Sequence, residues 1–398
     1  MATTYLTRTL GTPTNNKIWT FSAWIKKCDL AAYQNFFAAN SARDCIRFNN
    51  DDTIQMMFNE ASSGTITTSR KFRDTNGYFH VVWAVDTTQA TAANRVKLYI
   101  NGVQETSFST ETYPAQNYTC FINSAIEHRI GKDFTYVEYF GGIMSHVHFC
   151  DGTQLAPTVF GETDATTGEW KIKTSPSFTL GTNGFTILKD GNTITDQSTN
   201  SNNWTLGGGT LTNTEDCPDD VFCTLNPLAP ITTGSLSYGN TRIVGTVSTN
   251  YGYNTVGSLG DSKGKYYCEI KYTVANANTN CTVGVVNLNN HEPNVNTTSA
   301  TGGYVAFRLD GTKFINGSST AGYWATPTAG DIVMIALDMD NLKVWVGLNG
   351  SWYGTTGNTD GNPATGANPS ATITAGVFSP VNIRHLAGTF DCNFGNGY

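Results

Sequence analysis

The chain has 398 residues, and at roughly 150 residues per domain this length predicts two or three domains. Only 14% of the residues are charged, Gly occurs 40 times and aromatic residues make up 12%, a composition typical of many short strands joined by turns. The net charge of −7, without any run of three Lys or Arg, argues against nucleic-acid binding, and no apolar stretch approaches the ~20 residues of a membrane span.

We expect an all-β protein, because no window keeps apolar residues at helical spacing for three turns. Residues 1–160 form the first expected domain. Its strand-length apolar runs lie at residues 18–26, 45–50, 53–59, 79–102 and 140–150. The 79–102 run is a hairpin pattern that closes on Asn-Gly, the dipeptide that best tolerates the positive φ angles of a two-residue turn.

Side-chain alternation predicts which residues of this domain face its core. In VKLYI, the pattern places Val96, Leu98 and Ile100 inside, with Lys97 and Tyr99 outside. The tryptophans at 24 and 83 fall among the inward positions. We therefore interpret both as core residues rather than as a ligand platform.

The segments FSAWIK, YFHVVWAVD, KLYINGV, IGKD and YFGGIMSHVHF resemble the concanavalin A-like jelly roll of the laminin G and pentraxin group, over most of residues 1–155. The resemblance implies a β-sandwich and allows calcium. The acidic residue that usually follows Gly-x-Ile is Ser145 here, and no cluster at coordination spacing surrounds Asp133, Glu138 or Asp151. We expect no cofactor, with calcium as the open alternative.

The composition of the sequence changes between residues 161 and 235, which are rich in Gly, Asn, Thr and Asp and contain only scattered apolar residues. We interpret 161–235 as an extended connector that packs on the second domain and adds a strand or two to it.

Residues 236–398 form the second expected sandwich. Its strand patterns lie at 266–274, 281–288, 304–317, 330–350 and 390–398. The 330–350 hairpin repeats the design of 78–102 and also ends in Asn-Gly, which indicates two separate sandwich domains.

This second region resembles the SPRY fold. The residues that carry the resemblance are Gly330, Asp331, Leu337, Asp338, Asp340, Asn349, Gly350, Asn393, Phe394 and Gly395. Asp338 and Asp340 lie in a tight turn between two strands, where aspartates usually bond to their own backbone, so we expect capping rather than catalysis from them.

Metal and thiol chemistry have limited support. The nine cysteines are odd in number and the N-terminal residues MATTYLTRTL lack the apolar core of a signal peptide, so we expect reduced, mostly buried thiols. Cys217 and Cys223 in CPDDVFC fit either a disulfide or two metal ligands. His146 and His148 share one strand face and are the weak metal candidates, although no third or fourth ligand is apparent.

Catalytic motifs are missing. Glycosidases of the concanavalin A-like fold use two carboxylates on one strand in an E-x-D-x-x-E pattern, which does not occur here. The acids of GETD (161–164) and NTED (213–216) lie in expected loops, and there is no G-x-S-x-G or phosphate-binding glycine loop. We expect a protein that is not an enzyme.

A binding surface is the better-supported expectation. Alternation sends Lys343 and Trp345 to the face opposite Val344 and Val346. Together with nearby loop aromatics they form the candidate ligand-binding set, which is Trp324, Lys343, Trp345, Trp352 and Tyr353. Such a surface suits a sugar ring or another subunit, and the alternative that these aromatics cover the core remains open.

The order of the two modules and the connector between them resembles structural and fibre proteins of marine bacteriophages. This resemblance implies a non-catalytic virion component, either capsid decoration or tail fibre, that forms a homo-oligomer such as a trimer, contacts other virion proteins and is made in the host cytoplasm. The alternatives are a host-attachment adhesin that binds surface glycans and a polysaccharide hydrolase. The chain stops at Tyr398, soon after the expected last strand, which fits either truncation or a compact variant.

Overall fold

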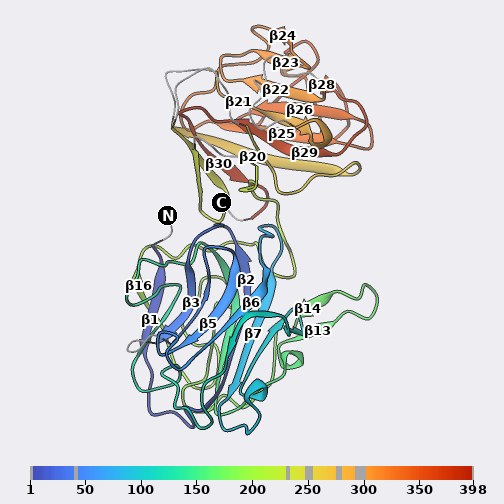
Figure 1. Cartoon of the computed structure of the whole chain (residues 1–398). Helices are drawn as coiled ribbons and strands as arrows, with labels where there is room; N and C mark the ends of the chain where they lie inside the picture. Colours follow the sequence, from blue (N-terminus) through green and yellow to red (C-terminus); the bar gives the residue numbers. More distant parts are fainter. Residues whose placement is uncertain are drawn as a thin grey trace. The chain divides into compact units, whose positions relative to one another are not determined.

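The computed structural model describes residues 3–39, 44–229, 234–246, 254–274, 280–291 and 302–396. The chain divides into two compact units, Met1–Val221 and Phe222–Tyr398, and each is built of packed β-sheets (Figure 1). Across these residues there is no α-helix, only the short 3-10 turns η1 (Ala92–Asn94), η2 (Pro157–Val159) and η3 (Leu288–Asn290). The expected all-β class is confirmed. No helix in the described ranges has the length and hydrophobicity needed to cross a bilayer.

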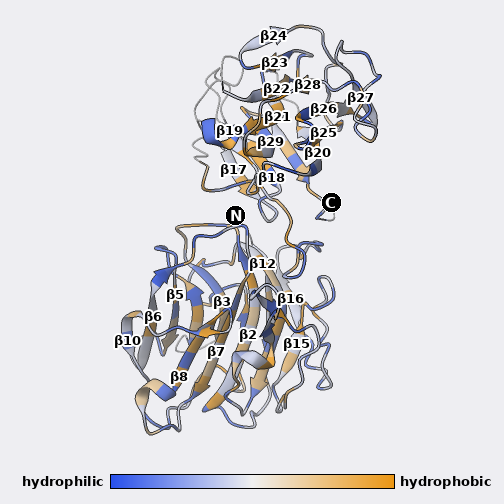
Figure 2. Ribbon diagram, turned by 90° about the vertical axis from the view of Figure 1, so that its right-hand side faces the viewer, coloured by the Kyte–Doolittle hydropathy of each residue, from blue (hydrophilic) through white to orange (hydrophobic). Residues whose placement is uncertain are grey.

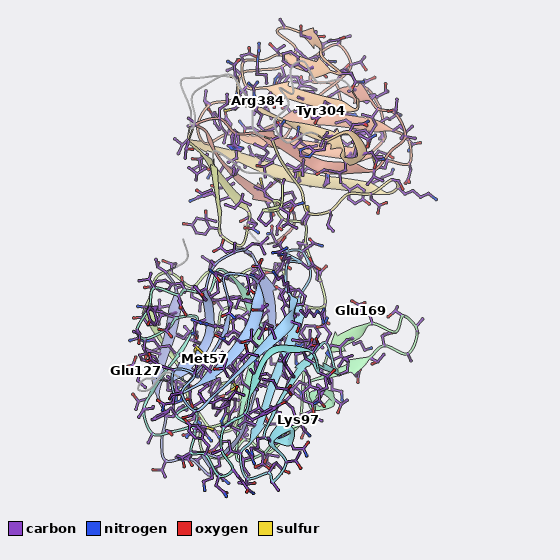
Figure 3. The ribbon with its side chains drawn as sticks, in the orientation of Figure 1. Met57, Lys97, Glu127, Glu169, Tyr304 and Arg384 are labelled. Carbon is purple, nitrogen blue, oxygen red and sulfur yellow. The ribbon has the colours of Figure 1, made fainter. Side chains whose placement is uncertain are left out.

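The first unit is a sandwich of two antiparallel sheets. In spatial order, the larger sheet has β10 (Phe108–Thr112), β6 (Gly64–Lys71), β5 (Thr53–Phe58), β4 (Cys45–Phe48), β3 (Gln34–Ala39), β11 (Glu127–Ile130), β1 (Tyr5–Thr9) and β16 (Thr205–Gly208). The smaller sheet has β15 (Phe185–Ile187), β12 (Gly142–Asp151), β2 (Ile18–Lys27), β7 (Phe79–Asp86), β8 (Val96–Ile100) and β9 (Val103–Gln104). A separate hairpin, β13 (Gly161–Thr163) with β14 (Trp170–Ile172), extends away from the sandwich, and its loop carries Glu169 (Figure 3).

The core of the first unit lies between the two sheets. Val96, Leu98 and Ile100 of β8 are buried in it as predicted, and so is Trp83. Trp24 is also buried, but it belongs to a second apolar cluster with Tyr78 that is distinct from the central core. The smaller sheet is therefore covered on more than its core face, which explains why its strand β7 is buried at every position.

Residues 161–221 supply much of that cover, so the prediction that the connector packs on the second domain is wrong for this segment. Strand β15 pairs with β12, β16 pairs with β1, and Trp170 and Ile172 of β14 pack in the cluster around Trp24. The physical reason is that the outer face of the smaller sheet carries Trp24 among polar side chains such as Ser22 and His80, and packing Trp170 and Ile172 of the following chain on this indole removes its apolar surface from water.

Two adjacent lysines at the end of β2 are both buried and both paired. The Lys26 ammonium lies 2.6 Å from Oδ2 of Asp216, and neither side chain is exposed. Tyr78 donates its hydroxyl hydrogen to the backbone carbonyl of Asp216 at 2.7 Å. Lys27 pairs with Asp52, which also receives a hydrogen bond from Arg73. Because strand alternation sends the two lysines to opposite faces, each needs its own carboxylate.

The second unit is also a two-sheet sandwich. Its larger sheet has the order β17 (Gly234–Ser237), β18 (Arg242–Gly245), β30 (Thr389–Asn393), β20 (Lys265–Val274), β25 (Ile332–Asp338), β26 (Lys343–Leu348) and β27 (Ser351–Tyr353), with β28 (Ala371–Thr372) also paired to β26. The other sheet has β19 (Asn254–Val256), β29 (Phe378–Arg384), β21 (Thr282–Asn287), β22 (Tyr304–Arg308), β23 (Lys313–Ile315) and β24 (Ser318–Thr320). Figure 2 shows that hydrophobic residues concentrate on the strands of both units.

The two predicted Asn-Gly turns are confirmed. Ile100 pairs with Val103 across Asn101-Gly102, whose φ angles are 48° and 79°. In the second unit, Leu348 pairs with Ser351 across Asn349-Gly350, with φ angles of 49° and 90°. Both central residues are left-handed, as a two-residue hairpin loop that follows the right-handed strand twist requires.

Candidate ligand-binding groove

The candidate site lies on the outer face of the larger sheet of the second unit. Three central strands run in register there, so that Tyr267 of β20, Ala336 of β25 and Trp345 of β26 form one row. Their chain neighbours Cys268 and Val346 point to the opposite face and belong to the core. Across the three strands, the outward-facing row thus consists of an aromatic residue, a small residue and a second aromatic residue.

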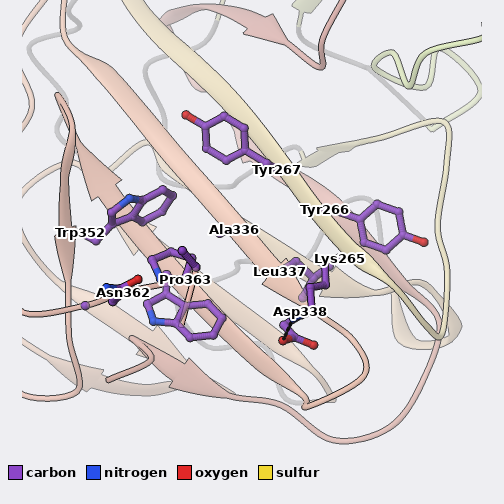
Figure 4. Close-up of a pocket in the computed structure, with 12 residues that line it drawn as sticks. Lys265, Tyr266, Tyr267, Ala336, Leu337, Asp338, Trp352, Asn362 and Pro363 are labelled. Atoms are coloured by element: carbon purple, nitrogen blue, oxygen red, sulfur yellow. Dashed lines mark ion pairs between the residues drawn. The ribbon is translucent and has the colours of Figure 1, made fainter. Parts of the chain in front are cut away.

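This row creates a groove, because the alanine leaves space between two large side chains. Neighbouring strands are about 4.8 Å apart, so the aromatic side chains start about 10 Å from each other with a methyl group between them. The groove has a volume of about 500 Å³ (Figure 4). Its lining residues are Lys265, Tyr266, Tyr267, Ala336, Leu337, Asp338, Trp345, Trp352, Gly361, Asn362, Pro363 and Ala364.

One side of the groove carries two accessible rings, Tyr267 and Trp352 (Figure 4). Their centroids lie 6.0 Å apart with the ring planes at 60°, and Tyr267 is 51% exposed. Trp352 lies against Gly347, where an added Cβ would be 3.0 Å from Cε3 of the indole. A glycine at this position of β26 therefore lets the indole rest on the sheet. Tyr267 donates its hydroxyl hydrogen to Glu269 at 2.7 Å. Partial burial of the phenol is the main cause that raises the pKa of Tyr267, and the Glu269 carboxylate raises it further.

The wall of the groove is a loop that the sheet holds in place. The Trp345 indole N–H donates to the Ala367 carbonyl at 2.9 Å, and the Lys343 ammonium donates to the Gly366 carbonyl at 2.7 Å. Ala367 also pairs with Asn362 through the backbone. Trp345 is only 1% exposed because this loop covers it. The wall is thus ordered by hydrogen bonds to side chains of β26.

The polar end of the groove is an ion pair between Lys265 and Asp338, 3.4 Å apart (Figure 4). Asp338 also accepts two hydrogen bonds from Asn341, from its backbone N–H at 2.9 Å and its side-chain amide at 3.0 Å. Burial raises the pKa of Asp338, but the Asn341 and Lys265 contacts outweigh it, so the net pKa is lowered. The carboxylate stays ionised at neutral pH.

The structure separates the five residues of the predicted binding set. Trp345 and Trp352 line the groove, and Lys343 supports its wall. Trp324 and Tyr353 are core residues, so their predicted place in an exposed aromatic surface is wrong. Trp324 is 5% exposed and donates its indole N–H to the Arg308 carbonyl, while the Tyr353 hydroxyl accepts from the Ala325 N–H. Each polar atom finds a backbone partner, which allows the rings to be buried.

The prediction overlooked Tyr267, Ala336, Lys265 and Asn362. Alternation along β20 and β25 could have indicated which of their residues face outward. Only the register between these strands, some seventy residues apart in sequence, shows that Tyr267 and Trp345 flank Ala336. The expected capping role of Asp338 agrees with its bonds to Asn341, and Asp340 bonds to the Gly264 N–H of a neighbouring turn.

The weak metal candidates in the first unit have other partners. His148 Nδ1 lies 2.9 Å from the Thr186 hydroxyl, and His146 Nδ1 lies 2.8 Å from the Ser145 hydroxyl. A β-bulge separates the two histidines, and the φ angle of His146 is 49°. Within the described ranges, no three His, Cys, Asp or Glu side chains are placed to hold a metal ion.

The calcium-candidate carboxylates and the cysteine pair also lie in ordinary protein contacts. Asp133 accepts from the backbone N–H groups of Thr135 and Tyr136, and Glu138 pairs with Arg47 at 2.9 Å. The Asp151 carboxylate accepts from the backbone N–H groups of residues 14, 15 and 183 and from the side-chain amide of Asn123. Cys217 and Cys223 are not joined by a disulfide.

Comparison with known proteins gives one family match. The family model described as "Concanavalin A-like lectin/glucanases superfamily" matches residues 2–160, which confirms the expected concanavalin A-like domain. A comparison with curated proteins gives no match.

Solved structures similar to the chain include a human SPRY domain, at 13% identity and TM-score 0.31 over 41% of this chain and 96% of that one. A putative carbohydrate-binding protein from Bacteroides ovatus is similar at 14% identity and TM-score 0.37 over 54% and 59% of the respective chains. A SAP-like pentraxin from Limulus polyphemus is similar at 16% identity and TM-score 0.30 over 39% and 72%.

Proposed function

We propose that this chain is a non-catalytic binding protein whose second unit holds a polysaccharide in the groove between Tyr267 and Trp345. The observation that carries the proposal is the combination of two accessible rings, a small-residue floor and a polar end. Sugar rings are amphipathic, with C–H groups that pack on aromatic faces and hydroxyls that need hydrogen-bond partners. Tyr267 and Trp352 offer the faces, and Lys265, Asp338 and Asn362 offer the polar atoms.

The groove lacks the constellation of a hydrolase. A glycosidase needs two carboxyl groups about 5 Å or about 6.5–9.5 Å apart across the scissile bond. Asp338 is the one carboxylate among the lining residues that the structure describes, and it is bonded to Asn341 and paired with Lys265. This supports binding over cleavage.

Removing either the exposed Tyr267 ring or the half-buried Trp352 ring is expected to weaken polysaccharide binding. Tyr267→Ala and Trp352→Ala should each lower affinity about tenfold, because a lost stacking contact and its buried area amount to about 1–2 kcal/mol. Native gels cast with and without soluble polysaccharide measure this as retardation. Tyr238→Ala is the matched control, since Tyr238 is 49% exposed, lies in the same unit and does not line the groove. Equal retardation of all three variants and the parent protein would remove the groove from the proposal.

As the setting for this binding activity, we propose the surface of a phage particle, where the chain serves as capsid decoration or tail fibre. The order of two sandwich modules in the sequence supports this, as does a composition with only 14% charged residues, which eases close packing between copies. The groove is then available for glycans of the host surface.

The virion proposal predicts a stable homo-oligomer in solution. Light scattering of the purified chain should give a multiple of 43.0 kDa that EDTA does not change. A monomer would favour a free adhesin over a virion component. Dissociation in EDTA would show that a structural metal holds the copies together, against the expectation of no cofactor.

A further inference from the structure

We infer that the groove of the second unit selects neutral polysaccharides and rejects acidic ones carrying carboxylate or sulfate groups. This inference rests on the proposed function and names the ligand class of the same site. It follows from how the charges around the groove are already paired.

The lining contains one cation and one anion among the described residues, and they are bonded to each other. Lys265 lies 3.4 Å from Asp338, whose side chain is only 4% exposed. An acidic sugar that recruited Lys265 would leave Asp338 without its ammonium partner, and stripping a buried carboxylate of its counter-ion is costly. The acidic sugar would also lie close to the Asp338 charge, and the two anions would repel each other.

Two charged residues near the lining, Lys343 and Glu269, are also engaged. Lys343 donates its ammonium hydrogen to the Gly366 carbonyl at 2.7 Å, which orders the loop wall. Glu269 accepts the Tyr267 hydroxyl hydrogen at 2.7 Å and adds a second negative charge beside the aromatic side. An anionic ligand therefore meets the Asp338 and Glu269 carboxylates, and neither Lys265 nor Lys343 can turn to it without breaking an existing contact.

A neutral sugar meets a more favourable set of partners. Asn362 uses its side-chain oxygen to accept the Thr365 backbone N–H at 3.1 Å, so its amide nitrogen is the group that would donate to a sugar hydroxyl. The Lys265–Asp338 pair can remain closed while its outer atoms contact hydroxyls, since Lys265 is 64% exposed. Neutral hydroxyls thus use the polar end without separating any ion pair.

The test compares polymers that share a glucan backbone and differ in whether their substituents are acidic. Hydroxyethyl cellulose is paired with carboxymethyl cellulose, and dextran with dextran sulfate, in affinity gels run with the full chain. We expect the neutral member of at least one pair to bind at least tenfold more tightly than its acidic counterpart. The preference should persist at 0.5 M NaCl, where long-range repulsion from the net charge of −7 is screened to within about 4 Å.

Ala364→Arg adds a cation to the wall of the groove at an exposed residue whose side chain makes no hydrogen bond. We expect this variant to gain about tenfold in affinity for the acidic polymer. Ser319→Arg, which adds the same charge on the exposed strand β24 of the other sheet, should leave both affinities unchanged.

The outcomes separate this inference from the proposed function. Acidic polymers that bind as tightly as neutral ones, with binding lost in Tyr267→Ala, would overturn neutral selectivity and keep the groove as the site. An equal gain from Ala364→Arg and Ser319→Arg would also count against selectivity set in the groove. If neither member of either pair binds, the polysaccharide proposal itself fails for these glucans, and both conclusions fall together.

Discussion

Lowering the pH from 7 to 5 is expected to reduce the stability of the first unit by several kcal/mol. Three histidines of this unit, His80, His128 and His148, are each no more than 2% exposed. Burial lowers the pKa of His80 to about 3, of His128 to about 4 and of His148 to about 3. At His128, the hydrogen bond to the Ile126 carbonyl raises the pKa and so opposes part of the effect of burial.

The hydrogen bonds of two of these rings support the same direction independently. His80 accepts the Trp170 indole N–H on Nδ1 at 3.0 Å and stacks on Trp24 at 4.8 Å. His128 accepts the Asn123 backbone N–H on Nε2 at 3.2 Å. A proton added to the accepting nitrogen, Nδ1 of His80 or Nε2 of His128, would face an N–H donor. Protonation therefore removes a hydrogen bond as well as burying a charge.

The direction of the stability change with pH follows from which state takes up protons first. The folded pKa lies below the unfolded value of about 6.5, so the unfolded state binds protons first as the pH falls. The stabilisation is complete above about pH 6.5 and is lost progressively down to the folded pKa. At pH 5 each histidine contributes a loss of about 2 kcal/mol, and three contribute about 6 kcal/mol.

Asp44 acts in the opposite direction. Burial raises its pKa to about 6, although backbone N–H groups of Asn59, Phe121 and Ile122 oppose the shift. A folded pKa above the unfolded one means that Asp44 favours folding as the pH falls below about 6, by about 1.4 kcal/mol at pH 5. For these three histidines and Asp44 together the expected loss is therefore about 4–5 kcal/mol, a large part of the stability of an ordinary domain, and His146, whose pKa burial lowers to about 4, adds to it.

Urea unfolding at pH 7, 6 and 5, followed by hydrogen exchange of peptides from residues 3–221, measures this loss in the full chain. His148→Gln keeps a partner for Thr186 and does not titrate, so it should remove about 2 kcal/mol of the pH dependence. A first unit equally stable at pH 7 and pH 5 would contradict the assignment of these rings as buried and neutral.

Asp216→Ala is expected to lower the free energy of unfolding of the first unit by about 3–5 kcal/mol. The substitution leaves the Lys26 ammonium, which is fully buried, without its carboxylate 2.6 Å away. It acts on the segment that covers the smaller sheet, since Tyr78 bonds to the backbone of the same residue. Urea unfolding monitored by tryptophan fluorescence gives the change directly.

Two controls distinguish the loss of a buried partner from the loss of a surface charge. Asp164→Ala removes the partner of Lys171 in the β13–β14 hairpin, where the lysine side chain is 45% exposed, and should have little effect. The double variant Lys26→Met with Asp216→Leu removes both charges and should recover most of the lost stability. A single variant as stable as the parent protein would show that the Lys26–Asp216 pair does not hold the segment.

Local patterns allowed much of the fold to be predicted. The strands at β2, β7, β20 and β25 and both Asn-Gly turns depend on alternation and on the φ preference of a dipeptide, which the sequence displays directly. Short polar strands such as β16 and β24 carry no such pattern and exist because a neighbouring strand offers hydrogen bonds. The connector was misplaced for a similar reason, since the partner of Asp216 is 190 residues away.

The candidate site was only partly predictable. Alternation indicated that Trp345 faces outward from its strand and Trp352 was expected in a nearby loop, and both do line the groove. Trp324 and Tyr353 are also aromatic residues near this hairpin, but they are buried. An aromatic side chain can turn into the core when its polar atom finds a backbone partner. The role of Ala336 depends entirely on its two neighbours across the sheet.

The division of the groove between sheet and loop has a consequence for how such a protein diversifies. Its rings and floor belong to β20, β25, β26 and β27, whereas Gly361, Asn362, Pro363 and Ala364 belong to a surface loop. Loop tips tolerate substitution and insertion far better than paired strands do. Under the proposed function, substitutions and insertions in this wall would therefore change the preferred ligand while the aromatic platform and the fold stay unchanged.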